Sequence, residues 1–212
     1  GPKFSVNVEI RASLLIHWLS FLKSYHLTGV ADNLLFAVES SVRETAGCIS
    51  LGLARPALFS LRTQIDLVLA WLYFKDHPVE WEAVNITGDG YKMKKELLDY
   101  LGTHHAGFNA RLSLLKQIKQ RAEAEPYRLL SAHIHGQSTA VLPVVNELKD
   151  LVRSLSICND CVCLTFEVVE YINDILLAVY PGRWHALPKE ICTELEKRFA
   201  SNEQRGTFFE GT

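Results

Sequence analysis

Apolar residues recur at the spacing of an α-helix along almost the whole chain, and this pattern limits the fold more than any other feature. One clear stripe follows the i, i+1, i+4, i+5, i+8 spacing and consists of Leu14, Leu15, Trp18, Leu19 and Leu22. The sequence shows neither the strict alternation of a half-buried strand nor an Asn-Gly hairpin signal, and it has no repeat of fixed period. We therefore predict an all-α, single-domain bundle of several helices.

Few residues interrupt this pattern. Among 212 residues there are 12 glycines and 7 prolines, fewer than in an average chain, which favours long helices. The longer helices are expected over 14–22, 32–52, 56–77, 108–124, 140–155 and 158–180. Shorter ones are expected over 79–84, 90–101 and 126–136, with a last one starting at Pro188.

The two ends of the chain are expected to lie outside the folded domain. Gly1-Pro2-Lys3 reads as the remnant of a cleaved purification tag, so residues 1–6 are assigned to a flexible N-terminus. Residues 7–200 form the predicted domain, a size that suits one apolar core. Residues 201–212 are expected to be a flexible tail.

Charge and cysteine content point to a soluble protein of a reducing compartment. Lys and Arg number 22 against 24 Asp and Glu, so no basic field covers the molecule and any contact with nucleic acid needs a local patch. Five cysteines, an odd number, without a secretory segment favour reduced thiols. No apolar run reaches the roughly 18 residues of a membrane span. We expect a cytoplasmic location and no membrane contact.

The segment 127–136, with the sequence YRLLSAHIHG, carries the most chemical information. Seven helical residues turn the chain by about 700°, so Arg128 and His135 share a face, with Ser131 between them. His133 lies about 140° from Arg128, on the side expected to pack. A guanidinium binds phosphate oxygens and an imidazole transfers protons near neutral pH, which suits metal-free cleavage of RNA by its own 2′-hydroxyl.

The same segment also has a purely structural interpretation. Arg128 could form an ion pair with Glu123 or Glu125 at the start of the helix. The serine hydroxyl could bond to its own helix, and both histidines could be capping or core groups.

Arg128 followed by His133 or His135 resembles the R-x4–6-H motif of HEPN-domain ribonucleases, which are small helical bundles. The longer string resembles a branch found in bacterial toxin–antitoxin and phage-defence loci. The resemblance implies a metal-independent endoribonuclease that needs no cofactor, acts on tRNA or mRNA as a homodimer, and has an antitoxin or defence partner. Arg128 would stabilise the phosphorane and a histidine would transfer protons. Leu129 departs from the family, which often has Asn directly after the arginine.

Four further residues are candidates for supporting roles in this site. Tyr127 and Ser131 belong to the motif itself, and Arg62 and Asp66 lie one turn apart in an apolar helix. Arg62 and Asp66 could be an ordinary i,i+4 ion pair. Alternatively, the carboxylate of Asp66 could orient His135 or Arg128.

The densest basic stretch offers a candidate surface for the RNA backbone. Its lysines are Lys92, Lys94, Lys95, Lys116 and Lys119. Such a stretch could equally be a solvated face.

Two other functions remain open. Leu129 and the near-neutral charge would fit a catalytically inactive helical module that binds a protein or nucleic-acid partner. A zinc-stabilised adaptor would use Cys158, Cys161 and Cys163, which contain one C-x-x-C pair. No second pair is visible in the sequence, so these cysteines are better explained as small buried apolar residues, and we expect no metal site.

Overall fold

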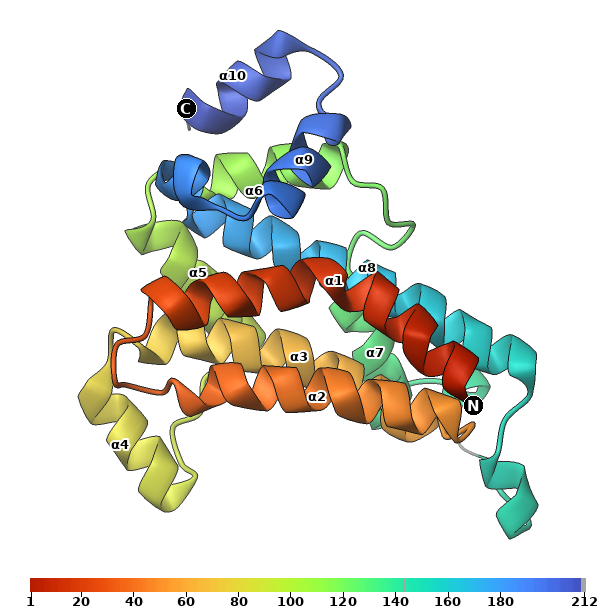
Figure 1. The fold of residues 1–212 in the computed structure, drawn as a ribbon. Coiled ribbons are helices and arrows are strands. Elements are labelled where there is room, and N and C mark those ends of the chain that lie inside the picture. The colour runs from red at the N-terminus through yellow and green to blue at the C-terminus, as the bar shows by residue number, and fades with distance from the viewer. Residues whose placement is uncertain (143, 211–212) are drawn as a thin grey trace.

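The computed structural model describes residues 1–142 and 144–210, and every regular element in them is helical (Figure 1). The α-helices are α1 (Pro2–Tyr25), α2 (Asn33–Ser50), α3 (Ala54–Phe74), α4 (Pro78–Thr87), α5 (Lys94–His104), α6 (Phe108–Gln117), α7 (Pro126–His135), α8 (Leu155–Val179), α9 (Lys189–Arg198) and α10 (Asn202–Glu210). Short 3₁₀ turns are η1 (Thr139–Val141), η2 (Leu148–Leu151) and η3 (Pro181–Ala186). The predicted all-α bundle is confirmed.

The four longest helices form the core of the bundle. In Figure 1, α1, α2, α3 and α8 run alongside one another, with α2 packed on α3 and α1 packed on α8. Trp18, Trp71 and Phe74 are completely buried between them, and burial of each such side chain contributes about 1.5–3 kcal/mol. The Trp18 indole N–H donates to Oδ1 of Asn173 at 2.8 Å, so the polar atom of this ring is also satisfied.

Helix α3 has the length and apolar character of a membrane-spanning segment. Its most apolar window is 61% buried inside the bundle. A helix at the centre of a bundle is buried in this way, so the apolar residues of α3 are explained by the core of the bundle.

Helix α7, which carries the Arg–His segment, lies at the edge of this core. Pro126 occupies its first turn, where a missing N–H costs nothing, and Gly136 ends it in the left-handed conformation at φ 57°. Leu130 is fully buried and fastens α7 to the bundle, where it packs on α3 and α8. The side of α7 opposite Leu130 therefore faces outwards.

Both ends of the chain differ from expectation, because each is packed against the bundle. Helix α1 begins at Pro2, and the Gly1 amino group donates to the Ser50 carbonyl at 3.1 Å, so the flexible start over 1–6 is wrong. The flexible tail is wrong for residues 202–210, which form α10. Phe208 is fully buried there, and its carbonyl accepts a 3.0 Å hydrogen bond from Nε of Arg111 on α6. Residues 211–212 lie outside the described residues.

Three predicted helices also differ from the structure. The helix expected over 108–124 ends at Gln117, because the backbone N–H groups of Gln120 and Arg121 donate to the Glu170 carboxylate at 2.7 and 2.6 Å. The helix expected over 140–155 is absent: before Leu155 the described residues of that range form only the end of η1, which starts at Thr139, and η2. Pro143 lies outside the described residues. Helix α8 begins before residue 158, at Leu155, with the Ser154 hydroxyl accepting from the Ile157 N–H at 3.4 Å.

Candidate functional site

Arg128 and His135 both lie at the surface of α7. The Arg128 side chain is exposed and lines the α5–α7 groove, a depression of about 590 Å³ between these two helices. His135 is exposed and is the last residue of α7, one residue before the left-handed Gly136. The pair is thus accessible to a ligand in solution, as the proposed chemistry requires.

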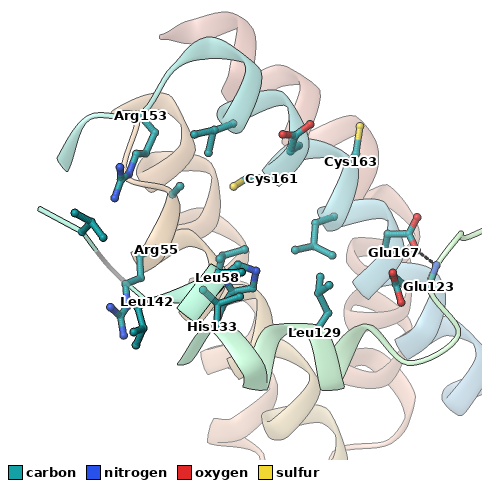
Figure 2. Close-up of a pocket in the computed structure, with 17 residues that line it drawn as sticks. Arg55, Leu58, Glu123, Leu129, His133, Leu142, Arg153, Cys161, Cys163 and Glu167 are labelled. Atoms are coloured by element: carbon teal, nitrogen blue, oxygen red, sulfur yellow. Dashed lines mark hydrogen bonds between the residues drawn. The ribbon is translucent and has the colours of Figure 1, made fainter. Parts of the chain in front are cut away.

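His133 opens into a different cavity. It lines the α3–α7–α8 pocket (Figure 2), which has a volume of about 640 Å³ and shares no lining residue with the α5–α7 groove. Ala54 and Leu58 of α3, Leu129 of α7 and Leu164 of α8 line the same pocket. Neither His133 nor His135 lines the α5–α7 groove that contains Arg128, so the pockets do not decide which histidine is its partner.

Arg128 is not neutralised by the acids that precede it. Within residues 1–142 and 144–210, no carboxylate oxygen lies within 4.0 Å of its guanidinium, whereas Glu125 pairs with Lys94 at 2.6 Å and lies 3.9 Å from Lys116. The structural interpretation of Arg128 as the partner of Glu123 or Glu125 is therefore wrong. Its charge is available to an anion.

Tyr127 is held in place by the two supporting residues of α3. Nη2 of Arg62 donates to the Tyr127 hydroxyl at 2.7 Å, and Nε of Arg62 lies 3.6 Å from Oδ2 of Asp66. Burial raises the pKa of Asp66, and the neighbouring Arg62 charge opposes that rise. In the described residues Arg62 and Asp66 fix Tyr127, and no hydrogen bond or ion pair joins either of them to Arg128 or His135.

Ser131 also lines the α5–α7 groove, but its hydroxyl oxygen is buried and has no hydrogen-bond partner among the described residues. A buried hydroxyl without a partner costs free energy. Rotation of this side chain toward a ligand in the groove would remove that cost.

The five lysines predicted to contact RNA are each engaged by the protein. Lys92 pairs with Glu80 at 3.1 Å, Lys95 pairs with Asp99 at 2.6 Å, and Lys94 and Lys116 share Glu125. Lys119 donates to the carbonyls of Arg121 and Ala122. Only Lys94 and Lys95 line the groove that contains Arg128. The surface is therefore a mixed one rather than a continuous basic track.

The cysteines do not come together as metal ligands. Cys158 and Cys161 are buried and Cys163 is exposed, and the described residues contain no group of three or more His, Cys, Asp or Glu side chains that could hold a metal ion. Burial raises the pKa of Cys161 to about 11, so its thiol stays protonated at neutral pH. This arrangement gives no support to a zinc adaptor.

The α3–α7–α8 pocket is also lined by two arginines that the sequence does not single out, Arg55 and Arg153. They are far apart in the sequence and belong to no motif. Only the packing of residues 152–153 on the turn before α3 brings the two arginines to one pocket, so no local sequence pattern predicts that they lie there.

Comparison with known proteins finds no matching family model, no similar curated protein and no similar solved structure.

Proposed function

We propose that the protein is a metal-independent endoribonuclease whose catalytic groups are Arg128 and His135. The observation that carries the proposal is the accessibility of both side chains on the outer side of α7, with no carboxylate on Arg128 among the described residues. On an ideal helix the two residues are separated by about 10 Å along the axis, a span that their side chains can bridge to reach one phosphodiester.

The proposed reaction needs no group that the chain lacks. A histidine takes the proton of the RNA 2′-hydroxyl, and the 2′-oxygen then attacks the adjacent phosphorus. The bond from phosphorus to the 5′-oxygen breaks, and the leaving oxygen takes a proton from a second acid, for which His135 of a second copy is the natural candidate. Arg128 stabilises the negative charge of the phosphorane. The products carry a 2′,3′-cyclic phosphate and a 5′-hydroxyl.

The experiment is a cleavage assay on tRNA and on a defined mRNA fragment in the presence of EDTA. We expect cleavage by the unmodified protein, and a loss of at least about 100-fold in rate for Arg128→Ala and for His135→Ala. Arg43→Ala and His185→Ala are matched controls, because both side chains are exposed and belong to α2 and η3 rather than to α7. His133→Ala reports whether the other histidine contributes.

The ends of the fragments provide the decisive readout. Cyclic phosphate ends identify attack by the 2′-hydroxyl, whereas 5′-phosphate ends would point to attack by water and would contradict the proposal. Intact RNA, or cleavage that persists in both alanine variants, would also contradict it.

A second candidate function is a catalytically inactive module that binds a partner protein. It is favoured by a group of apolar side chains in and beside the segment that replaces the predicted 140–155 helix. They are between 40% and 84% exposed and comprise Leu142, Val144, Val145, Leu148, Leu151, Val152, Leu155 and Ile157. Exposed apolar side chains that gather in this way are typical of an interaction surface. If the protein is such a binding module, we expect the RNA to remain intact in the same assay.

A further inference from the structure

Three exposed cations line one depression between α1, α8 and α9. They are Arg11 on α1 and Lys189 and Lys197 on α9, and the depression has a volume of about 540 Å³. Within residues 1–142 and 144–210, no carboxylate oxygen lies within 4.0 Å of the charged group of any of the three. The five lysines predicted to contact RNA are all engaged by the protein, so these three cations are more available to an anionic polymer.

Two acids line the same depression, but they do not cancel its positive charge. Glu190 lies 3.9 Å from Nδ1 of His17, and Glu194 is half-buried, with an Oε1 that has no hydrogen-bond partner among the described residues. Burial raises the pKa of Glu194, so the charged form of this acid is disfavoured there. Three positive charges therefore face at most two negative ones, and the excess attracts an anion.

A second depression continues the first one along α1 and α8. It has a volume of about 300 Å³, shares Ile10 and Arg11 with the first, and is also lined by Asn7, Asn159, Val162 and Cys163. None of these lining residues is acidic. The side-chain amides of Asn7 and Asn159 can donate to phosphate oxygens or to base edges. The two depressions together are called the α1–α8–α9 surface below.

Apolar side chains lie beside the cations of this surface. Cζ of Arg11 lies 5.6 Å from the centre of the Phe166 ring, and Ile10 is 63% exposed. Proteins that bind single-stranded nucleic acid combine cations along the backbone with aromatic rings on which the bases stack. An acidic peptide would use the cations but has no need of the ring, so the surface suits RNA better.

The second depression also adjoins the pocket beside α7. Cys163 lines both of them, and Figure 2 shows its thiol pointing away from His133 of α7. The pocket itself contains the acids Glu123, Asp160 and Glu167, so contacts with phosphate are expected on the α1–α8–α9 surface and not in the pocket. A strand bound at α7 can thus continue across α8 to the three cations.

We infer that the α1–α8–α9 surface binds single-stranded RNA, with phosphates on Arg11, Lys189 and Lys197 and a base against Phe166. The inference rests on the proposed function, which supplies RNA as the ligand. It assigns the RNA backbone to cations other than the five lysines predicted from the sequence. These contacts are remote from the cleaved bond, so their loss should raise KM and leave kcat unchanged.

The test is fluorescence anisotropy with a labelled single-stranded RNA of about 20 nucleotides and the full chain carrying His135→Ala, in EDTA. Adding Arg11→Gln, Lys189→Gln and Lys197→Gln should weaken binding at least tenfold at about 100 mM salt. The slope of log K against log salt should become shallower by about 2, because three phosphate contacts are lost. The matched control is Arg43→Gln, Lys149→Gln, Arg183→Gln, which removes three exposed charges outside this surface and should keep the original affinity.

Two further measurements separate RNA from other anions. Phe166→Leu keeps an apolar side chain without an aromatic face and should weaken RNA binding at least threefold, with the helical circular dichroism spectrum unchanged. Poly-glutamate at the same concentration of negative charge should displace the RNA at least tenfold less effectively than unlabelled RNA. Equal displacement by poly-glutamate would identify a surface for an acidic protein and would overturn the inference.

The remaining outcomes distinguish this inference from the proposed function. Weaker binding in the triple variant supports the RNA surface even if the cleavage assay shows intact RNA. The inference is overturned, while the proposed function stands, if cleavage depends on Arg128 and His135 but the triple variant or Phe166→Leu binds RNA like its parent chain. Absence of RNA binding at about 100 μM protein and low salt also overturns it.

Discussion

Tyr127 lies between two cations, and this arrangement explains why an aromatic residue precedes Arg128. Cζ of Arg62 is 4.8 Å and Nζ of Lys94 is 4.7 Å from the centre of its ring, while its hydroxyl accepts from Arg62. Each cation favours the electron-rich face of the ring. The residue next to the candidate catalytic arginine is thereby fixed to α3 and α5.

Replacement of this hydroxyl should have a measurable cost. Tyr127→Phe keeps the ring but leaves Nη2 of Arg62 without its acceptor, so we expect the free energy of unfolding to fall by about 1–2 kcal/mol in urea denaturation. Tyr25→Phe is the matched control, because Tyr25 is 74% exposed. An equal effect in both variants would mean that the bond to Arg62 contributes nothing.

His26 gives the protein a predictable response to acid. Its ring packs on Phe21 and Tyr180, and burial, together with the charges of Arg183 and Lys75, lowers its pKa in the folded state. The unfolded chain therefore binds a proton near pH 6.5 that the folded chain does not bind. The free energy of unfolding should fall as the pH is lowered through 6.5 towards the folded-state pKa.

The corresponding measurement is urea denaturation at pH 7.5, 6.5 and 5.5, values that bracket the ordinary pKa of histidine. His26→Phe keeps an aromatic ring at the position and should make the decline in stability with acid smaller, whereas His185→Gln at an exposed site should leave it unchanged. His105, whose pKa burial also lowers, accounts for part of the remaining decline. A decline of the same size in His26→Phe would contradict this account.

At the level of the helices, periodicity predicted which segments are helical better than it predicted where they end. The apolar stripe of Leu15, Trp18 and Leu22 is buried as expected. The helix that begins at Phe108 stops short because Glu167 and Glu170 on α8 bind the backbone N–H groups of residues 120–123. Those acceptors are distant in sequence, so no local pattern could reveal them.

In the segment 140–155 a helix was predicted where none forms. Its apolar residues have helical spacing, yet Leu148, Val152 and Leu155 are 84%, 61% and 72% exposed. Spacing predicts a helix only where a neighbouring element buries the stripe, because burial supplies most of the stability of a helix in a protein. In the described part of the chain no neighbouring element buries these side chains, and the segment forms the 3₁₀ turns η1 and η2 instead of a helix.

Gly52 controls how this segment attaches to the bundle. Its φ is +78°, and a Cβ at this position would lie 2.8 Å from Cγ1 of Val152. Gly52→Ala should therefore lower the free energy of unfolding by at least about 1 kcal/mol, from the left-handed backbone alone. Gly47→Ala in the interior of α2 is the control; a Cβ there meets nothing within 4 Å, and we expect a gain of about 0.5–1 kcal/mol. Thermal or urea unfolding of both variants separates the two effects.

At the scale of the whole molecule, the sequence relates residues that share one face of a helix, but it does not relate residues that only tertiary packing brings to one pocket. Arg128 and His135 could be placed together because helical geometry relates residues seven apart. Arg55, Arg153 and Glu167 line the α3–α7–α8 pocket because tertiary packing brings their helices and loops together, and nothing in the spacing of these residues relates them.

Residue spacing also gives no indication of the cluster of buried charges, which tertiary packing brings together. Glu170 and Asp174 lie on α8 among apolar residues and are fully buried, together with Arg121 and Arg198. Arg121 contacts the two carboxylates at 3.3 and 2.5 Å, and Arg198 contacts Asp174 at 2.8 Å. Arg198 also donates to the carbonyls of Ile118 and Leu115, so this cluster joins α8, α9 and the end of α6.

Two positive and two negative charges balance in this cluster, and removal of one should be costly. Glu170→Gln leaves an uncompensated buried arginine and weakens the bonds to the N–H groups of Gln120 and Arg121, so we expect a loss of about 3–5 kcal/mol in urea unfolding. Glu203→Gln on the exposed side of α10 should change stability by less than about 0.5 kcal/mol. A loss below about 1 kcal/mol for Glu170→Gln would show that the charges are solvated and that apolar packing alone holds α9 to the bundle.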